Sequence, residues 1–153
     1  MNEERNVQFE VDPRFQDEVD ILVMERTVEA GLNRLDRDPR TALAVNFSGD
    51  ARVKDFNQRF REVEKTTDVL AFPADFVDPD LEVPYLGDIL ISVPKAARQA
   101  EAAGHALQKE LQLLVVHGLL HLAGYDHREP EEKERMWALQ RQILSDLGVE
   151  IKI

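Results

Sequence analysis

The stretch LQKELQLLVVHGLLHLAGYDH, at residues 107–127, decides the fold of this chain. Residues 107–122 are apolar on nearly every face of a helix, which predicts a buried helix at the centre of the molecule. Within it, His117 and His121 are four residues apart and share one face, so both imidazoles converge on one point. Gly124 predicts the end of the helix, because glycine adopts the left-handed conformation that turns the chain back.

A third histidine, His127, completes the spacing H-x-x-x-H-x-x-G-x-x-H. On an unbroken helix it would lie about 15 Å along the axis from His117, so the turn at Gly124 is needed to bring it back. Three neutral imidazoles leave the fourth tetrahedral position of one zinc ion to water, which is typical of a catalytic site. The sequence therefore predicts a zinc centre at His117, His121 and His127, although the same donors accept nickel or copper.

Nuclease and peptidase hypotheses differ at one position of this motif. The spacing is similar to the HExxHxxGxxH pattern of the metzincin zinc peptidases, which implies a zincin-like metal helix, but Gly118 stands where those enzymes have their catalytic glutamate. An ion held by three neutral ligands keeps its double-positive charge, which favours an anionic phosphodiester over a neutral peptide. A zinc peptidase stays open as an alternative, and it requires another carboxylate within reach of the metal-bound water.

Composition bounds the class of protein. The chain has 153 residues, of which 43% are hydrophobic, enough for one domain spanning residues 1–153. It has no cysteine, which leaves His, Asp and Glu as metal ligands. The net charge of −11 argues against bulk electrostatic binding of nucleic acid, and residues 52–65 are the one basic strip, either a phosphate contact or a solvated helix face. Without a long apolar run or a signal peptide, the protein is expected to be cytoplasmic and free of membrane contact.

Hydrophobic periodicity predicts a mixed series of strands and helices. Strands are expected at residues 6–11, 41–47, 68–72 and 85–93. Helices are expected from residue 12 to residues 36–39, and at residues 50–60, 94–103, 107–122 and 130–147. Pro73 is expected to stop the third strand, and the acidic residues 74–84 to form an irregular loop, either a lid, a partner surface or a disordered crossing. This order predicts an α+β (mixed α/β) fold, with a small mixed sheet of about four strands packed against five or so helices.

Three stretches together resemble the YbeY family of rRNA maturation endoribonucleases. They are HGLLHLAGYDH at residues 117–127, FNQRFREVEKTTDVLAFP at residues 56–73 and LGDI at residues 86–89, and the resemblance spans most of the domain. Departures from the family pattern in the second stretch include Phe60 for tyrosine, Glu64 for aspartate, Thr66 for proline and Ala71 for serine.

The resemblance implies a function and a set of site residues. The family's metal ligands fall on His117, His121 and His127, and the arginine associated with its activity falls on Arg61. Membership implies a single-strand-specific, zinc-dependent endoribonuclease in 16S rRNA 3′-end maturation, ribosome biogenesis and ribosome quality control. Its partners would be single-stranded RNA and the small ribosomal subunit with its proteins, and not DNA. A non-catalytic ribosome assembly factor, with structural zinc and residues 74–84 bound to a basic ribosomal protein, is a further alternative.

Other polar or aromatic residues have weaker signals. Asp126 either orients a ligand histidine or lies at the surface. Asp68 and Asp88, at strand ends, are expected to be structural. His105 lies outside the motif and is expected to be a surface histidine. Trp137 is assigned to the core without a functional role.

Overall fold

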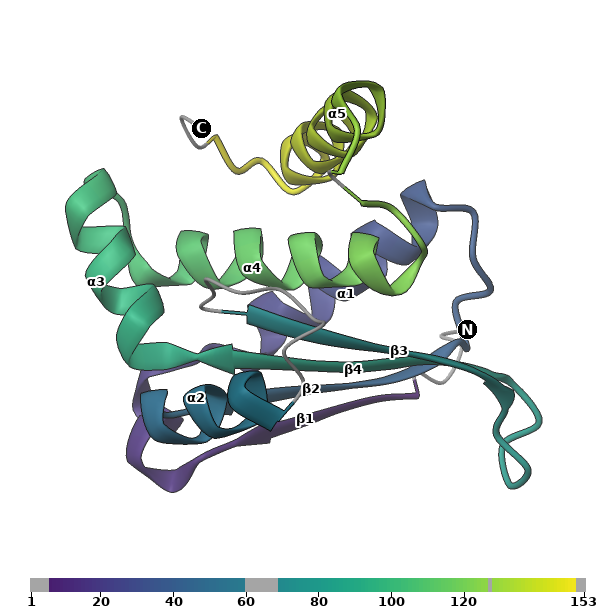
Figure 1. Cartoon of the computed structure of the whole chain (residues 1–153), viewed down its shortest axis with the longest axis horizontal. Coiled ribbons are helices and arrows are strands. Elements are labelled where there is room, and N and C mark those ends of the chain that lie inside the picture. The colour runs from purple at the N-terminus through teal and green to yellow at the C-terminus, as the bar shows by residue number, and fades with distance from the viewer. Residues whose placement is uncertain (1–5, 60–68, 127, 151–153) are drawn as a thin grey trace.

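A four-stranded mixed β-sheet forms the base on which the helices pack (Figure 1). The computed structural model describes residues 6–59, 69–126 and 128–150. The strand order is β1-β2-β4-β3, with β1, β2 and β4 parallel and β3 antiparallel to β4. The strands are β1 (Val7–Val11), β2 (Ala42–Ser48), β3 (Val69–Val77) and β4 (Pro84–Ser92). This sheet confirms the predicted α+β class.

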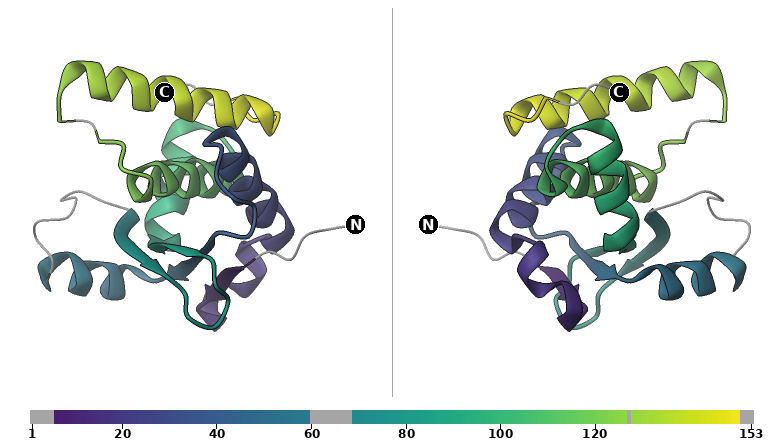
Figure 2. Two further views of the ribbon diagram at one scale, coloured as in Figure 1. Left: turned by 90° about the vertical axis from the view of Figure 1, so that its right-hand side faces the viewer. Right: turned by 90° about the vertical axis from the view of Figure 1, so that its left-hand side faces the viewer.

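Helices cover both faces of this sheet (Figure 1, Figure 2). They are the 3₁₀ helix η1 (Pro13–Glu18) and the α-helices α1 (Ile21–Arg34), α2 (Asp50–Arg59), α3 (Val93–Ala103), α4 (Leu107–Leu122) and α5 (Pro130–Asp146). On one face lie α1 and α4, on the other lies α2, and α5 packs on the side of α4 away from the sheet. The order of elements is the predicted one, apart from a division of the first helix.

Successive side chains of β4 pack on opposite faces of the sheet, which explains why helices are needed on both faces. Ile89 and Ile91 belong to the main core, together with residues of α1 and α4. Leu90, between them, packs instead with Leu70 of β3 and Val53 of α2. Successive side chains of a strand point to opposite faces, so an apolar run of this kind is buried only when both faces are covered.

The helix α4 occupies the centre of the molecule, as its sequence predicts. Ten of its residues are buried, and it contacts the sheet, α1, α3 and α5. A Cβ atom added at Gly31 of α1 would lie 2.2 Å from Leu119 Cδ2, and one at Gly118 would lie 3.0 Å from Ile89 Cγ2. The helix is therefore tightly packed between α1 and β4, which restricts its movement.

None of the described helices has both the length and the apolar character that crossing a bilayer requires.

The prediction of one continuous helix from residue 12 is wrong, because the chain is extended at Val19 and Asp20, between η1 and α1. Gln108 of α4 stabilises the break: its Oε1 accepts a hydrogen bond from the Asp20 N–H at 3.1 Å, and its Nε2 donates to the Glu18 carbonyl at 2.6 Å. Asp20 then caps α1 by accepting a hydrogen bond from the Val23 N–H. A contact from a distant helix therefore sets this boundary.

The third strand continues past Pro73, so the prediction that proline would stop it is wrong. Since β3 is an edge strand, a residue without an N–H group is tolerated there. Pairing with β4 shifts after Pro73 and resumes with Phe76 opposite Tyr85, whose rings stack with centroids 5.1 Å apart. The acidic residues 74–84 thus belong largely to an ordered hairpin, closed by Asp78, which accepts hydrogen bonds from two backbone N–H groups.

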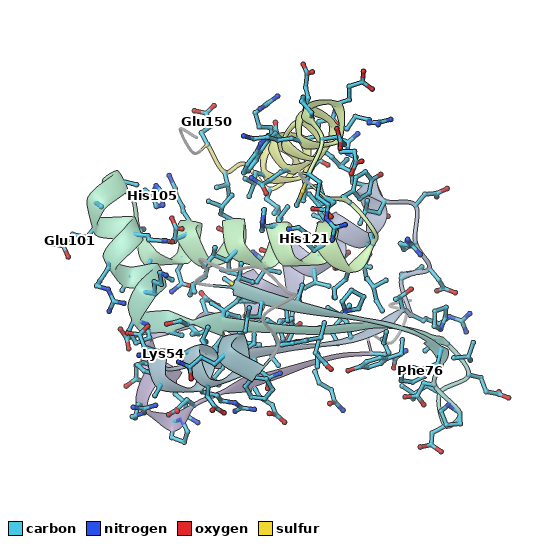
Figure 3. All side chains as sticks on the ribbon, in the orientation of Figure 1. Lys54, Phe76, Glu101, His105, His121 and Glu150 are labelled. Carbon is cyan, nitrogen blue, oxygen red and sulfur yellow. The ribbon has the colours of Figure 1, made fainter. Side chains whose placement is uncertain are left out.

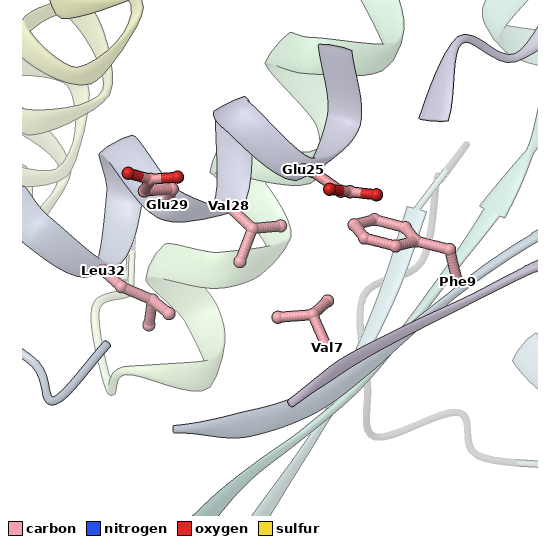
Figure 4. Close-up of a pocket in the computed structure, with 6 residues that line it drawn as sticks. All are labelled: Val7, Phe9, Glu25, Val28, Glu29 and Leu32. Carbon is pink, nitrogen blue, oxygen red and sulfur yellow. The ribbon is translucent and has the colours of Figure 1, made fainter. Parts of the chain in front are cut away.

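A pocket of about 220 Å³ lies between β1 and α1 (Figure 4). Its lining residues are Val7, Phe9, Glu25, Val28, Glu29 and Leu32. The two carboxylates are on α1 and belong to exposed residues, whereas the remaining lining is apolar. None of these six residues lies on α4 or α5, so the pocket is separate from the histidine site.

Candidate metal centre

Two imidazoles meet near the carboxyl end of α4. His117 and His121 lie one turn apart, and their Nε2 atoms are 3.1 Å apart. The ring centroids are separated by 4.7 Å, and the ring planes are inclined by 76°. Both side chains are half-buried. The structure therefore brings these two predicted ligands together, with the same nitrogen of each ring directed at the shared point.

Gly124 ends α4 as its position in the motif predicts. Its φ of 99° is left-handed. Its N–H donates to the His121 carbonyl at 3.0 Å, and the Tyr125 N–H donates to the Leu120 carbonyl at 3.0 Å. These two bonds form a Schellman motif, which satisfies carbonyl groups that the helix itself leaves without partners. The chain consequently turns away from the helix axis directly after the second histidine.

Two predicted site residues, His127 and Arg61, lie outside the described residues. Among residues 6–59, 69–126 and 128–150, no three His, Asp or Glu side chains come close enough to hold a metal ion. Arg52 and Lys54, which belong to the predicted basic strip, are exposed on α2. Lys54 lies on the opposite face of the sheet from His121 (Figure 3). These two basic residues are therefore not beside the histidine pair.

Gln140 and Trp137 of α5 lie against His117. Gln140 is fully buried, and its Oε1 atom lies 3.0 Å from Nδ1 of His117. The Trp137 ring centroid is 5.9 Å from that of His117, with the planes inclined by 30°. Neither residue is predicted as part of the site from the sequence. Trp137 is expected in the core, and Gln140 has no local signal beyond its place three residues later on the same helix. Trp137 is half-buried and forms part of the site.

A second apolar cluster attaches α5 to α4. Met136 and Ile143 of α5 pack with Val116 and Leu120 of α4. Gln140 is four residues after Met136 and three before Ile143, so it lies on the same face of α5 and is directed toward α4. The cluster therefore determines where this glutamine meets the histidine.

Gly118 faces the sheet and not the histidine pair. A Cβ atom at this position would meet three side-chain atoms of Ile89 at 3.0 to 3.3 Å. Ile89 is fully buried, so a larger residue would have to displace it. A glutamate at this position, which carries the catalytic residue in the peptidase pattern, would therefore require Ile89 to shift.

Asp126 and Asp88 each have a polar partner among the described residues. Asp126 pairs with the Arg128 guanidinium at 2.8 Å. Asp88 accepts a hydrogen bond from the Tyr85 hydroxyl. Burial, followed by the contact with Asp88, raises the pKa of Tyr85 above its usual range, so this phenol stays protonated. Asp68 lies outside the described residues.

His105 is not the surface histidine that the sequence predicts. Its side chain is 13% exposed, that of Glu110 is 7% exposed, and Nε2 of the imidazole lies 2.7 Å from the carboxylate oxygen. The pair joins the turn after α3 to the first turn of α4, at the opposite end of that helix from His121 (Figure 3). His105 is therefore outside the candidate metal centre.

Fold and site together define an α+β protein whose buried central helix presents a pair of histidines supported by the last helix. The model of the family described as Endoribonuclease YbeY matches residues 5–148. The chain belongs to this family.

Curated relatives agree with the family match. The Endoribonuclease YbeY of Limosilactobacillus reuteri is 42% identical over 120 residues, covering 71% of this chain and 76% of the relative. That of Listeria welshimeri is 38% identical over 142 residues, covering 86% and 88%. The solution structure of TM1509 from Thermotoga maritima is similar with a TM-score of 0.61 and 25% identity, covering 92% of this chain and 88% of that one.

Proposed function

We propose that this protein is a zinc-dependent, single-strand-specific endoribonuclease of the cytoplasm. Its proposed role is in 16S rRNA 3′-end maturation, ribosome biogenesis and ribosome quality control, with single-stranded RNA and the small ribosomal subunit as partners. The observation that carries the proposal is the 3.1 Å separation of His117 Nε2 and His121 Nε2, in a chain of the Endoribonuclease YbeY family.

The donor atoms suit one zinc ion. With Zn–N distances of about 2.0–2.1 Å, neighbouring nitrogens of a tetrahedral site are about 3.3 Å apart. The two Nε2 atoms, at 3.1 Å, are close to that separation. His127 is proposed as the third ligand, with the fourth position left to water. When bound, the ion would polarise a water molecule or a phosphoryl oxygen.

The chain's own groups are proposed to bind the phosphate and stabilise its charge. Arg61 would donate parallel N–H bonds to the phosphate as negative charge builds on it. Because residue 118 is a glycine, no carboxylate is available at the peptidase position, and the RNA 2′-hydroxyl is the proposed nucleophile. Its oxygen bonds to phosphorus and loses its proton to solvent, while the 5′-oxygen leaves and takes up a proton. The products then carry cyclic phosphate and 5′-hydroxyl ends, and 5′-phosphate ends would refute this route.

Cleavage of labelled single-stranded and duplex RNA by the purified protein tests the proposal. We expect zinc-dependent cleavage of the single strand alone, abolished by a chelator and by His121→Ala. His105→Ala is the matched control, since this histidine lies outside the site, and it should retain cleavage. Cleavage of an unstructured peptide in place of RNA would favour the zinc peptidase. An inactive wild-type protein that unfolds on zinc removal would favour the assembly factor with structural zinc.

The role of Arg61 is tested separately. Arg61→Ala should depress cleavage while the zinc content, measured by elemental analysis, stays at the wild-type level. Arg52→Ala is the control, because Arg52 is exposed on α2, the helix on the other face of the sheet from α4, and it should leave both quantities unchanged. A joint loss of cleavage and zinc in Arg61→Ala would contradict the assigned role.

A further inference from the structure

We propose that Gln140 is a positioning residue. Its carboxamide oxygen holds His117 as the Nδ1–H tautomer and thereby presents the Nε2 lone pair to a cation shared with His121. The identity of that cation rests on the proposed function, whereas the tautomer depends only on residues that already touch in this structure.

The tautomer follows from the atoms that meet. A carboxamide oxygen accepts hydrogen bonds and cannot donate them, so the 3.0 Å contact between Gln140 Oε1 and His117 Nδ1 requires the proton on Nδ1. The other nitrogen of a neutral imidazole then has a lone pair. That nitrogen is the one that faces His121 Nε2 at 3.1 Å. A cation ligand is thus directed into the space between the two rings.

The reversed carboxamide would have the opposite effect. Its NH₂ group would donate to Nδ1 of His117, and the ring proton would then lie on Nε2. The nitrogen that faces His121 would lose its free lone pair and could no longer bind a cation. The orientation of one amide therefore decides which nitrogen of the histidine is available, and the tautomer is measurable.

The surroundings of Gln140 favour a role in the site over a role in packing. The side chain is fully buried, on the face of α5 that packs with α4. Within the described part of the chain, its Nε2 atom has no hydrogen-bond acceptor. A buried donor without an acceptor destabilises a fold, so an apolar residue would serve packing better here. The contribution of the Gln140 amide is therefore its hydrogen bond to His117.

Two variants and one control separate positioning from stability. Gln140→Leu removes the acceptor, and Gln140→Glu keeps an acceptor oxygen. Gln112→Leu is the control, because Gln112 is also buried and donates to Thr27 Oγ1 at 3.1 Å, without touching either histidine. Nitrogen-15 NMR of the zinc-free protein identifies the tautomer of His117, chelator competition measures the zinc dissociation constant, and thermal unfolding measures stability.

We expect His117 to be the Nδ1–H tautomer in the wild type and in Gln140→Glu, with zinc affinity retained. Gln140→Leu should shift the ring to the Nε2–H tautomer and weaken zinc binding by about 10- to 100-fold. Gln112→Leu should lose stability and keep its zinc affinity. An Nε2–H tautomer in the wild type, or a folded Gln140→Leu with unchanged tautomer and affinity, would overturn the proposal. Failure of the wild type to bind zinc would refute the proposed function, and the tautomer of the zinc-free protein would still decide the role of Gln140.

Discussion

Replacing Gly87 with alanine should loosen the junction between β3, β4 and the end of α4. Gly87 lies opposite Pro73 in the β3–β4 pairing and has a φ of 142°. An added Cβ atom would lie 2.4 Å from the Phe72 carbonyl oxygen and 2.8 Å from Leu122 Cδ2. A backbone carbonyl cannot rotate aside as a side chain does, so β3 or α4 has to move.

Two terms add to give the expected loss of stability. A backbone conformation that non-glycine residues rarely adopt costs about 1–3 kcal/mol. Overpacking a buried position costs about 1–3 kcal/mol more, so the free energy of unfolding should fall by about 2–6 kcal/mol. For a chain of this size, the melting temperature should fall by about 5–20 °C.

Gly104→Ala is the matched control for this prediction. Its φ of 77° is also positive, but nothing lies within 4 Å of the position that a Cβ atom would take. Only the cost of the left-handed backbone conformation applies here, so the free energy of unfolding should fall by about 1–2 kcal/mol. Urea unfolding followed by circular dichroism compares the two variants. If Gly87→Ala proves no less stable than Gly104→Ala, the reasoning from the close contacts is refuted.

Metal, pH and packing predictions follow from other contacts. Trp137 is the only tryptophan of the chain, and its ring centroid lies 5.9 Å from that of His117. Binding of Co²⁺ or Cu²⁺ at the histidines should therefore quench its fluorescence. Quenching that persists in His117→Ala would contradict the proposed metal position. A side-chain hydrogen bond from Arg14 lowers the pKa of Asp12 from 3.8 to about 2, so ionised Asp12 contributes stability above pH 3.8 that is lost as the pH falls through about 2. Asp12→Asn should therefore lower the urea midpoint near neutral pH and progressively less on acidification, and a constant effect would argue against the ion pair. Gly118→Glu, which completes the peptidase pattern, should lose about 1–3 kcal/mol because it must displace a side chain of β4; a stable variant that cuts peptides would be inconsistent with that packing.

Local signals in the sequence predict the centre of the molecule well. Residues 107–122 form α4 with the predicted bounds, because apolar residues surround the helix and Gly124 ends it in a left-handed conformation. The four-residue spacing of His117 and His121 places them on one face of any helix, whatever packs around it. The family resemblance, drawn from three local motifs, is confirmed by the match to residues 5–148.

Contacts between distant segments decide the features that the sequence does not predict. Gln108 stabilises the break before α1 through a hydrogen bond to Asp20, 88 residues away in the sequence. Local hydrophobic periodicity cannot predict a hydrogen bond between such distant residues. Pro73 is tolerated because β3 is an edge strand, which depends on the order of the whole sheet. Gln140 is 23 residues from His117, and only the packing of α5 on α4 brings the two side chains together. Before that packing is known, Gln140 is one polar helix residue among several.

The attachment of α5 has a consequence for how activity is gained and lost. Its contact cluster with α4, which includes Met136 and Ile143, is distinct from the main core around the sheet. During synthesis, the strands and α4 emerge before α5, so the nascent chain acquires its histidines before the support for His117. On heating, partial undocking of α5 would separate Gln140 from His117 while the sheet and the two histidines of α4 stay in place. Loss of cleavage activity should therefore precede global melting as the temperature rises, and coincidence of the two would contradict a separately docked α5.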